Sequence, residues 1–348
     1  MSTVGTSGPT TQIIVQQPPT MFGRFGKLLL VVIGICVLTI FALMAKYQSY
    51  FTPRDQPQER FHSLSRTATK KIAILRVEGV ILDTDDFVKR QIDRIREDDS
   101  VVAVVARINS PGGTVTASDY IHHHLHQLVE DRDLPLVVSM GSVCASGGYY
   151  VAMAVGPQED SIFAERATWT GSIGVIMPHY DLSALLDQIH VEDDSITSGE
   201  LKDMGTPTKP MTPEERAVLQ ELVMESFEEF KEIVLAGRPK LKDKPEDLAV
   251  ITTGRIFTAQ QAVDRGLVDK IGFLEEAIER AAELANVSTD SVRCVEYEQP
   301  PSVLGSLLGE NDLKGTLGQG VNMRGLLELT TPRAYYLWTW LPAALASE

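Results

Sequence analysis

The stretch that decides the fold is Cys144-Ala145-Ser146-Gly147-Gly148-Tyr149-Tyr150. The apolar run Pro135 to Met140 before it predicts a short buried strand, and the small residues from Gly141 onward predict a tight turn into a helix. Ser146 therefore lies where a strand ends and a helix begins, and the amides of the first helical turn are free there to stabilise an anion. The two glycines that follow Ser146 allow a second backbone to approach closely.

Ser146 has two interpretations. It is either a nucleophile with an oxyanion site beside it, or a helix N-cap serine in a glycine-rich turn. The heptapeptide alone favours the cap, and the remainder of the chain favours the nucleophile.

The run Val101 to Ile108 is rich in β-branched residues, which is typical of a strand covered on both faces. It leads into a loop whose glycines, Gly112 and Gly113, leave backbone amides unshielded. Strands alternate with helical patterns here, so we expect a layered α/β domain with parallel strands. Loops that follow parallel strands gather at one edge of the sheet, and these glycines are expected to meet Ser146 there.

Composition and charge argue against several classes of protein. The chain has 348 residues, 43% of them hydrophobic, and a formal net charge of −15. Such a charge argues against nucleic acid as a partner, because phosphates would repel it. Cys36, Cys144 and Cys294 are too few and too scattered for a disulfide framework. No Cys/His spacing resembles a zinc site, so we expect neither a metal nor a cofactor.

Four histidines lie in a helix expected from Thr116 to Glu130: His122, His123, His124 and His126. A metal site would use His122 and His126, which are one turn apart, but no third ligand is evident. The pattern therefore favours a solvated helix face.

The N-terminal region predicts a membrane anchor. Residues 1–27 are expected to be a disordered segment, because their first twenty are rich in Thr, Ser, Gly, Gln and Pro. Leu28 to Ala45 is uncharged and just long enough to span a bilayer. A cleaved signal peptide is the competing interpretation, but Leu43 stands where a small residue is needed. Residues 46–69 are expected to form a linker, and basic residues on both sides of the span leave its orientation open.

A nucleophilic serine needs a base, and the sequence offers two candidates. His179 and Asp181 could complete a Ser-His-Asp triad, although their surroundings predict the capped start of a helix. Lys202 follows a polar segment, Val191 to Ser198, which we expect to be a strand ending in a glycine turn. A lysine acts as a base only when it is neutral, and burial beside a substrate favours that form.

Five motifs in order give the chain a family resemblance over about residues 70–290. They resemble the signal peptide peptidase A family, whose members are membrane-anchored serine-lysine peptidases with a crotonase/Clp-protease type fold. The motifs are Asn109-Ser110-Pro111-Gly112-Gly113, Ala145-Ser146-Gly147-Gly148-Tyr149-Tyr150, Thr170-Gly171-Ser172-Ile173-Gly174-Val175, Ser198-Gly199-Glu200-Leu201-Lys202-Asp203 and Gly254-Arg255-Ile256-Phe257-Thr258.

The resemblance implies roles for particular residues. Ser146 would be the nucleophile, Lys202 the general base, and Ser172 would hold and orient the lysine ammonium. The oxyanion donors would be the amide of Gly147 and that of Gly113 or Gly112. Two departures from the family pattern stand out, namely Glu200, where many members carry a basic or neutral residue, and a longer segment between Tyr150 and Ile162.

The resemblance also implies an assembly and a location. Pro213 to Gly237 is a long amphipathic pattern, and in the family this region packs between subunits of a ring-like homo-oligomer. A peptidase domain over residues 70–298 would lie outside the cytoplasm, held by a single span in the cell membrane. Its substrates would be hydrophobic peptides, including spent signal peptides.

The C-terminal segment, residues 299–348, is less defined. It ends in the aromatic run Tyr335 to Pro342, which is too short to span a membrane. An interfacial anchor, a subunit contact and a tail that enters the chain's own substrate groove all remain open. Two other functions are also open for the domain: a crotonase-like acyl-CoA enzyme, and a non-catalytic membrane scaffold of the same fold.

Overall fold

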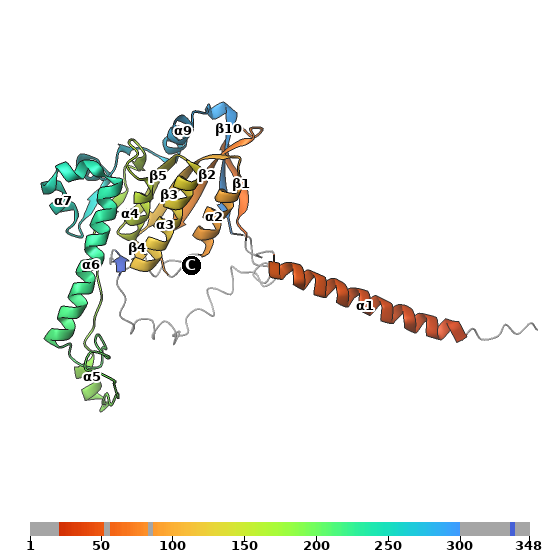
Figure 1. Ribbon diagram of the computed structural model, residues 1–348, viewed down its shortest axis with the longest axis horizontal. Coiled ribbons are helices and arrows are strands. Elements are labelled where there is room, and N and C mark those ends of the chain that lie inside the picture. The colour runs from red at the N-terminus through yellow and green to blue at the C-terminus, as the bar shows by residue number, and fades with distance from the viewer. Residues whose placement is uncertain (1–20, 52–55, 83–85, 300–334, 338–348) are drawn as a thin grey trace, which may run out of the picture. The chain divides into compact units, whose positions relative to one another are not determined.

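The computed structural model describes residues 21–51, 56–82, 86–299 and 335–337. It divides into two compact units, one before and one after residue 55 (Figure 1). The first unit is α1, Met21–Phe51. Its segment Gly26–Met44 has a mean hydropathy of 2.7 and no buried residue, so by length and composition it could cross a bilayer.

The second unit is built on a nine-stranded sheet in the order β1-β10-β2-β3-β5-β6-β9, with β7 paired to β5 and β8 paired to β7. The pairs are parallel except β1 with β10 and β7 with β8. This confirms the predicted α/β domain with mostly parallel strands. The strands are β1 Gln58–Leu64, β2 Lys70–Glu78, β3 Val101–Ser110, β5 Leu136–Ala145, β6 Ile162–Ala164, β7 Trp169–Gly171, β8 Ile256–Thr258, β9 Lys270–Ile271 and β10 Val292–Glu298.

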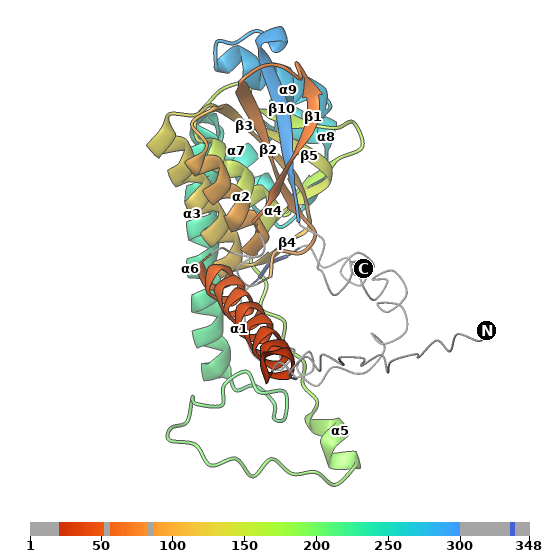
Figure 2. The same cartoon turned by 90° about the vertical axis from the view of Figure 1, so that its right-hand side faces the viewer.

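Helices cover both faces of the sheet (Figure 2). The face that carries the larger core packs on α2 Asp86–Glu97, α3 Val115–Arg132, α4 Gly147–Ala152 and α6 Pro213–Gly237, and the other packs on α9 Leu274–Leu284. Shorter elements complete the fold: α5 Ser183–Gln188, α7 Pro245–Ile251, α8 Ala259–Asp264, and the 3-10 turns η1 Met153–Val155, η2 Pro239–Asp243 and η3 Thr289–Ser291.

The continuous apolar run of β3 is explained by this two-sided cover. Successive side chains on a strand point to opposite faces. Val104 and Ala106 belong to the core on the α3 side, whereas Val105 lies in the core on the α9 side. A strand buried on both faces does not alternate apolar with polar residues, so its continuous apolar run predicts a buried strand.

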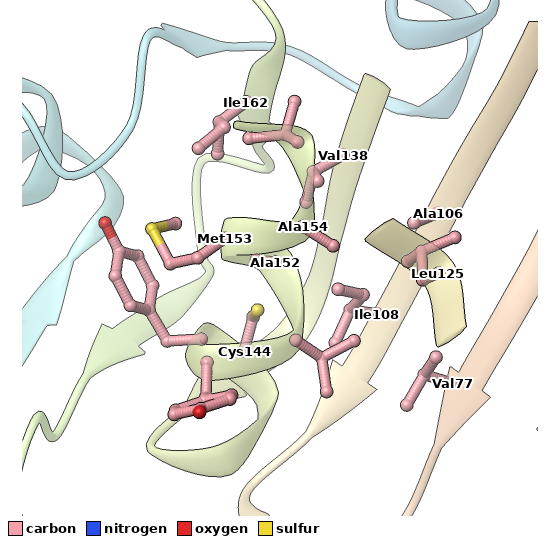
Figure 3. Packing of buried hydrophobic residues seen from close by; sticks show 14 of the residues in the cluster. Val77, Ala106, Ile108, Leu125, Val138, Cys144, Ala152, Met153, Ala154 and Ile162 are labelled. Atoms are coloured by element: carbon pink, nitrogen blue, oxygen red, sulfur yellow. The ribbon is translucent and has the colours of Figure 1, made fainter. Parts of the chain in front are cut away.

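The core beneath α4 fixes the turn that precedes this helix. Cys144, Ala152, Met153 and Ala154 lie within the larger core cluster, close to the strands (Figure 3). The hydroxyl of fully buried Tyr149 donates a 2.9 Å hydrogen bond to the carbonyl of Leu267. These contacts hold a helix that is only six residues long and has little stability of its own.

Two predicted segments differ in the structure. The predicted linker over residues 46–69 contains β1, because this mostly polar strand pairs with β10 at a sheet edge, where most of its side chains stay exposed. The prediction of a strand over Val191 to Ser198 is wrong. Those residues are exposed and form no strand, because none of the described strands lies beside them to accept their hydrogen bonds.

Candidate active site

Ser146 is held in a conformation that serine rarely adopts. It follows the last residue of β5 and has φ 52° and ψ −117°. Its amide donates to the carbonyl of Gly171 at 2.8 Å, and its own carbonyl accepts from the Tyr150 amide at 2.9 Å. Ser146 occupies the N-cap position of α4, but its side chain makes no capping hydrogen bond. The cap interpretation thus explains the position and leaves the hydroxyl without a structural role there.

Two glycine loops meet beside Ser146, as the parallel topology predicted. Gly112 has φ +99°, and a Cβ at this residue would lie 2.6 Å from the amide nitrogen of Gly147. A Cβ on Gly147 would lie 3.1 Å from the amide nitrogen of Gly113. A Cβ on Gly113 would lie 1.7 Å from the carbonyl oxygen of Ile81. At Gly112 and Gly113 the backbones approach too closely for any side chain, and at Gly147 a Cβ would also lie 2.3 Å from the hydroxyl oxygen of Ser118.

The amides of the two loops are not equivalent. The Gly112 amide donates to the hydroxyl of Ser110 at 3.0 Å, so this N–H already has an acceptor. The amides of Gly113 and Gly147 approach the same small space next to Ser146. That space is suited to an oxygen atom that carries negative charge.

Ser172 lies on the neighbouring strand end. Gly171, the last residue of β7, pairs with Ala145, and Ser172 follows with φ 52°. Its amide donates to the carbonyl of Arg255 at 2.8 Å, and its side chain is largely buried. Ser172 also lines a hollow of about 390 Å³ between the segment that follows β7, the loop 252–254 and α6. The structure therefore brings Ser172 to the same sheet edge as Ser146.

Lys202 lies away from the sheet edge that carries Ser146 and Ser172. Residues 177–212 form an arm that includes α5 and projects past the N-terminal end of α6, away from α4 (Figures 1 and 2). Lys202 is exposed in a turn of this arm, where its amide donates to the Gly199 carbonyl at 3.1 Å. Within one chain, the structure does not bring Lys202 to Ser146.

The alternative base lies on the same arm. His179 places Nε2 3.3 Å from the carbonyl oxygen of Thr206. The Asp181 carboxylate accepts from the amide and the hydroxyl of Ser183, which lowers the pKa of Asp181. Asp181 is thus engaged at the start of α5 and, within the described residues, forms no hydrogen bond with His179.

The predicted solvated face of α3 is only partly solvated. His122 is partly buried, and its ring contacts the ring of Tyr150 with centroids 5.2 Å apart. Burial, and to a lesser degree the nearby His126, lower the pKa of His122 to about 4. Within the described ranges, no three His, Cys, Asp or Glu side chains group closely enough to hold a metal.

A strand from the C-terminal segment occupies the groove beside Ser146. β11, Tyr335–Leu337, pairs antiparallel with β4, Gly112–Thr114, so that Tyr336 lies opposite Gly113. On the other side of β11, Tyr335 exchanges two backbone hydrogen bonds with Ile176, at 2.9 and 3.0 Å. These three tail residues therefore enter the chain's own groove, and the rest of residues 300–348 lies outside the described ranges.

The sequence pointed to this contact only weakly. The aromatic run in the tail marked Tyr336 as unusual, but nothing in the sequence identified Ile176 as the second edge of the groove. A residue that contributes only its backbone N–H and C=O leaves no side-chain signature.

Comparisons with known proteins include a peptidase family model and several proteins named as proteases. A family model described as "Peptidase family S49" matches residues 129–288. The chain is 37% identical over 260 residues to "Putative protease slr0021" of Synechocystis sp., which covers 74% of this chain and 90% of that protein. It is 34% identical over 291 residues to "Putative signal peptide peptidase SppA" of Enterococcus faecium, covering 77% and 82%. It is 30% identical over 298 residues to "Protease 4" of Haemophilus influenzae, covering 82% and 46%.

Proposed function

We propose a reaction for this protein from one premise: the chain belongs to the signal peptide peptidase A family, peptidase family S49, and has the Clp-protease-like fold of that family. It is a serine peptidase by this membership. The catalytic residues, the assembly and the substrates are our inferences from the structure and from the resemblance to that family.

Ser146 is the proposed nucleophile. Its Oγ attacks the carbonyl carbon of a peptide bond while the base takes the hydroxyl proton, and the resulting oxyanion accepts hydrogen bonds from the amides of Gly147 and Gly113. The C–N bond then breaks, the base returns the proton to the leaving amine, and water hydrolyses the acyl-enzyme by the same route. The observation that carries this proposal is the meeting of two amide-bearing glycine loops beside a serine with positive φ.

Lys202 is the proposed base, and we infer that it acts on a neighbouring copy of the chain. The arm carries Lys202 away from its own Ser146, so a cis reaction would require the arm to refold. In a neighbouring copy, Lys202 would enter the hollow beside Ser172, whose hydroxyl would orient the ammonium. Burial there would favour the neutral amine that a base requires.

Exposed apolar side chains on the arm support such an assembly. α5 contributes no buried residue to its own domain, and Ile196 is 99% exposed. Apolar residues gathered on a projecting segment indicate a protein contact that one chain does not satisfy. The set on the arm is Tyr180, Leu182, Leu185, Ile189, Val191 and Ile196. We therefore propose a homo-oligomer, ring-like as in the family.

The membrane is the second proposed partner. α1 would anchor the peptidase domain as a single span, with the domain outside the cytoplasm, and hydrophobic peptides such as residual signal peptides would be the substrates. A groove that binds its occupant through backbone hydrogen bonds on both sides accepts many sequences in extended form.

Complementation between inactive variants tests the base assignment. Ser146→Ala and Lys202→Ala should each abolish peptidase activity when expressed alone. Co-expression of the two variants should restore roughly a quarter of wild-type activity, because a random mixture forms about that share of sites with both residues intact. Substantial activity of Lys202→Ala alone would exclude Lys202 as the base. Inactive single variants that fail to complement would place the reaction within one chain. Loss of activity in a stable His179→Ala variant would support the Ser-His-Asp triad.

A further inference from the structure

A fully buried serine lies where the two glycine loops meet. Ser118 is the fourth residue of α3 and has no exposed surface. A Cβ on Gly147 would lie 2.3 Å from the hydroxyl oxygen of Ser118, which is closer than the 3.1 Å to the amide nitrogen of Gly113. The Ser118 hydroxyl therefore packs directly against the α-carbon of Gly147, on the same side as the Gly113 amide.

The same hydroxyl is bonded to the loop that carries Gly113. It donates a 2.9 Å hydrogen bond to the carbonyl of Thr114, the next residue along the chain. The Thr114 amide in turn donates to the carbonyl of Ile81 at 2.8 Å. These bonds fix the loop, so the Ser118 oxygen acts as a stop against Gly147.

Neither helix formation nor burial requires a hydroxyl at this position. Thr114 is the N-cap residue of α3, and the carbonyl of an N-cap accepts the first helical N–H without help from a side chain. Alanine has a higher helix propensity than serine and leaves no polar group to bury. What the serine adds is an oxygen atom that links the Thr114 carbonyl to Gly147, and its role therefore lies between the two loops.

We propose that Ser118 is a positioning residue that sets the separation of the two oxyanion donors. The proposal rests on the proposed function, because it takes the amides of Gly113 and Gly147 to bind the oxyanion. Without the Ser118 oxygen a gap opens beside Gly147, and the amide of Gly147 can shift away from the oxyanion. Ser118 acts through Gly147 and takes no part in the proton transfers.

The size of the effect is bounded by the loss of a whole donor. Removal of one oxyanion hydrogen bond lowers kcat by about 10²–10³-fold. A donor that is displaced but still present should cost less, so Ser118→Ala should lower kcat by roughly tenfold to a hundredfold. KM should change little, because the oxyanion forms only after the substrate has bound.

Steady-state kinetics of the detergent-solubilised full chain on a fluorogenic hydrophobic peptide test the proposal. Ser161→Ala is the matched control. Ser161 is also fully buried, and its hydroxyl donates to the carbonyl of Glu159 at 3.0 Å, but it lies at the opposite sheet edge, where β6 begins. Both variants lose a buried hydroxyl, so both should lower the midpoint of thermal unfolding. Only Ser118→Ala should lower kcat.

A peptide aldehyde provides a second measurement. The Oγ of Ser146 adds to the aldehyde carbon and the hydroxyl proton goes to the base, so the adduct carries an oxyanion. In Ser118→Ala the inhibition constant of the aldehyde should rise by about the factor by which kcat falls. The inhibition constant of the peptide alcohol with the same sequence, which forms no adduct, should change by less than about twofold.

Other results overturn the proposal in distinguishable ways. An unchanged kcat in Ser118→Ala, an equal loss of kcat in Ser161→Ala, or an unchanged inhibition constant of the aldehyde would show that Ser118 does not position the donors, while the wild type still hydrolyses the peptide. A wild-type chain that hydrolyses neither the peptide nor an unfolded protein, and that does not bind the aldehyde, would overturn the proposed function itself.

Discussion

His122→Phe should weaken the acid sensitivity of the fold. Burial lowers the pKa of His122 from 6.5 to about 4 in the folded chain. Between these values the unfolded chain binds a proton that the folded chain does not, so stability rises with pH through this window and is complete above about pH 6.5. From pH 7.5 to pH 5 the wild type should lose about 2 kcal/mol of unfolding free energy through this residue. Phenylalanine keeps the ring that packs on Tyr150 and removes the titration.

Guanidinium denaturation of the full chain in detergent, at pH 7.5 and pH 5, measures the effect. The difference in unfolding free energy between the two pH values should be about 2 kcal/mol smaller for His122→Phe than for the wild type. His123→Phe is the matched control, because this ring is exposed on the same helix, and it should behave as the wild type does. An unchanged pH dependence in His122→Phe would refute the claim that burial keeps this imidazole neutral. The neighbouring groups are His126, His123 and Asp119 on α3, and Tyr150 on α4.

Three further substitutions probe the scaffold of the site. Tyr149→Phe removes a buried hydroxyl that donates to the Leu267 carbonyl, and should lower the unfolding free energy by about 1 kcal/mol in the same denaturation assay. Gly113→Ala would place a Cβ 1.7 Å from the Ile81 carbonyl oxygen, so peptide hydrolysis should be lost; activity close to wild type would show that these loops need not approach so closely. Arg238→Met leaves the partly buried carboxylate of Asp269 without its ion pair and should cost roughly 1.5–3 kcal/mol, measured by thermal unfolding. A loss under about 1 kcal/mol would mean that the Ser161 and Ile162 amides alone stabilise that charge.

The sequence predicted those features that depend on local pattern. The β-branched run of β3 and the helical spacing of α6 identified their elements, because buried strands and amphipathic helices carry periodic apolar signals. The meeting of Gly113 with Ser146 was predictable, since loops after parallel strands share an edge.

Features that depend on pairing between distant segments were not predictable. β1 is mostly polar and largely exposed, and its pairing with β10, which no local pattern encodes, makes it a strand. β11 is separated by more than 200 residues from β4, and its aromatic residues did not indicate which strand it pairs with. The position of Lys202 depends on the direction of the arm, which no local pattern encodes.

The central claim is that Ser146 is the attacking hydroxyl, and covalent labelling tests it most directly. The full chain is treated with a fluorophosphonate, digested, and the modified residue is identified by mass spectrometry. We predict a single adduct on Ser146, which is lost in Ser146→Ala. An excess of a peptide with the sequence of residues 332–339, which competes for the groove, should reduce the amount of this adduct. An active enzyme whose label lies on another serine, or which is not labelled at all, would contradict the account.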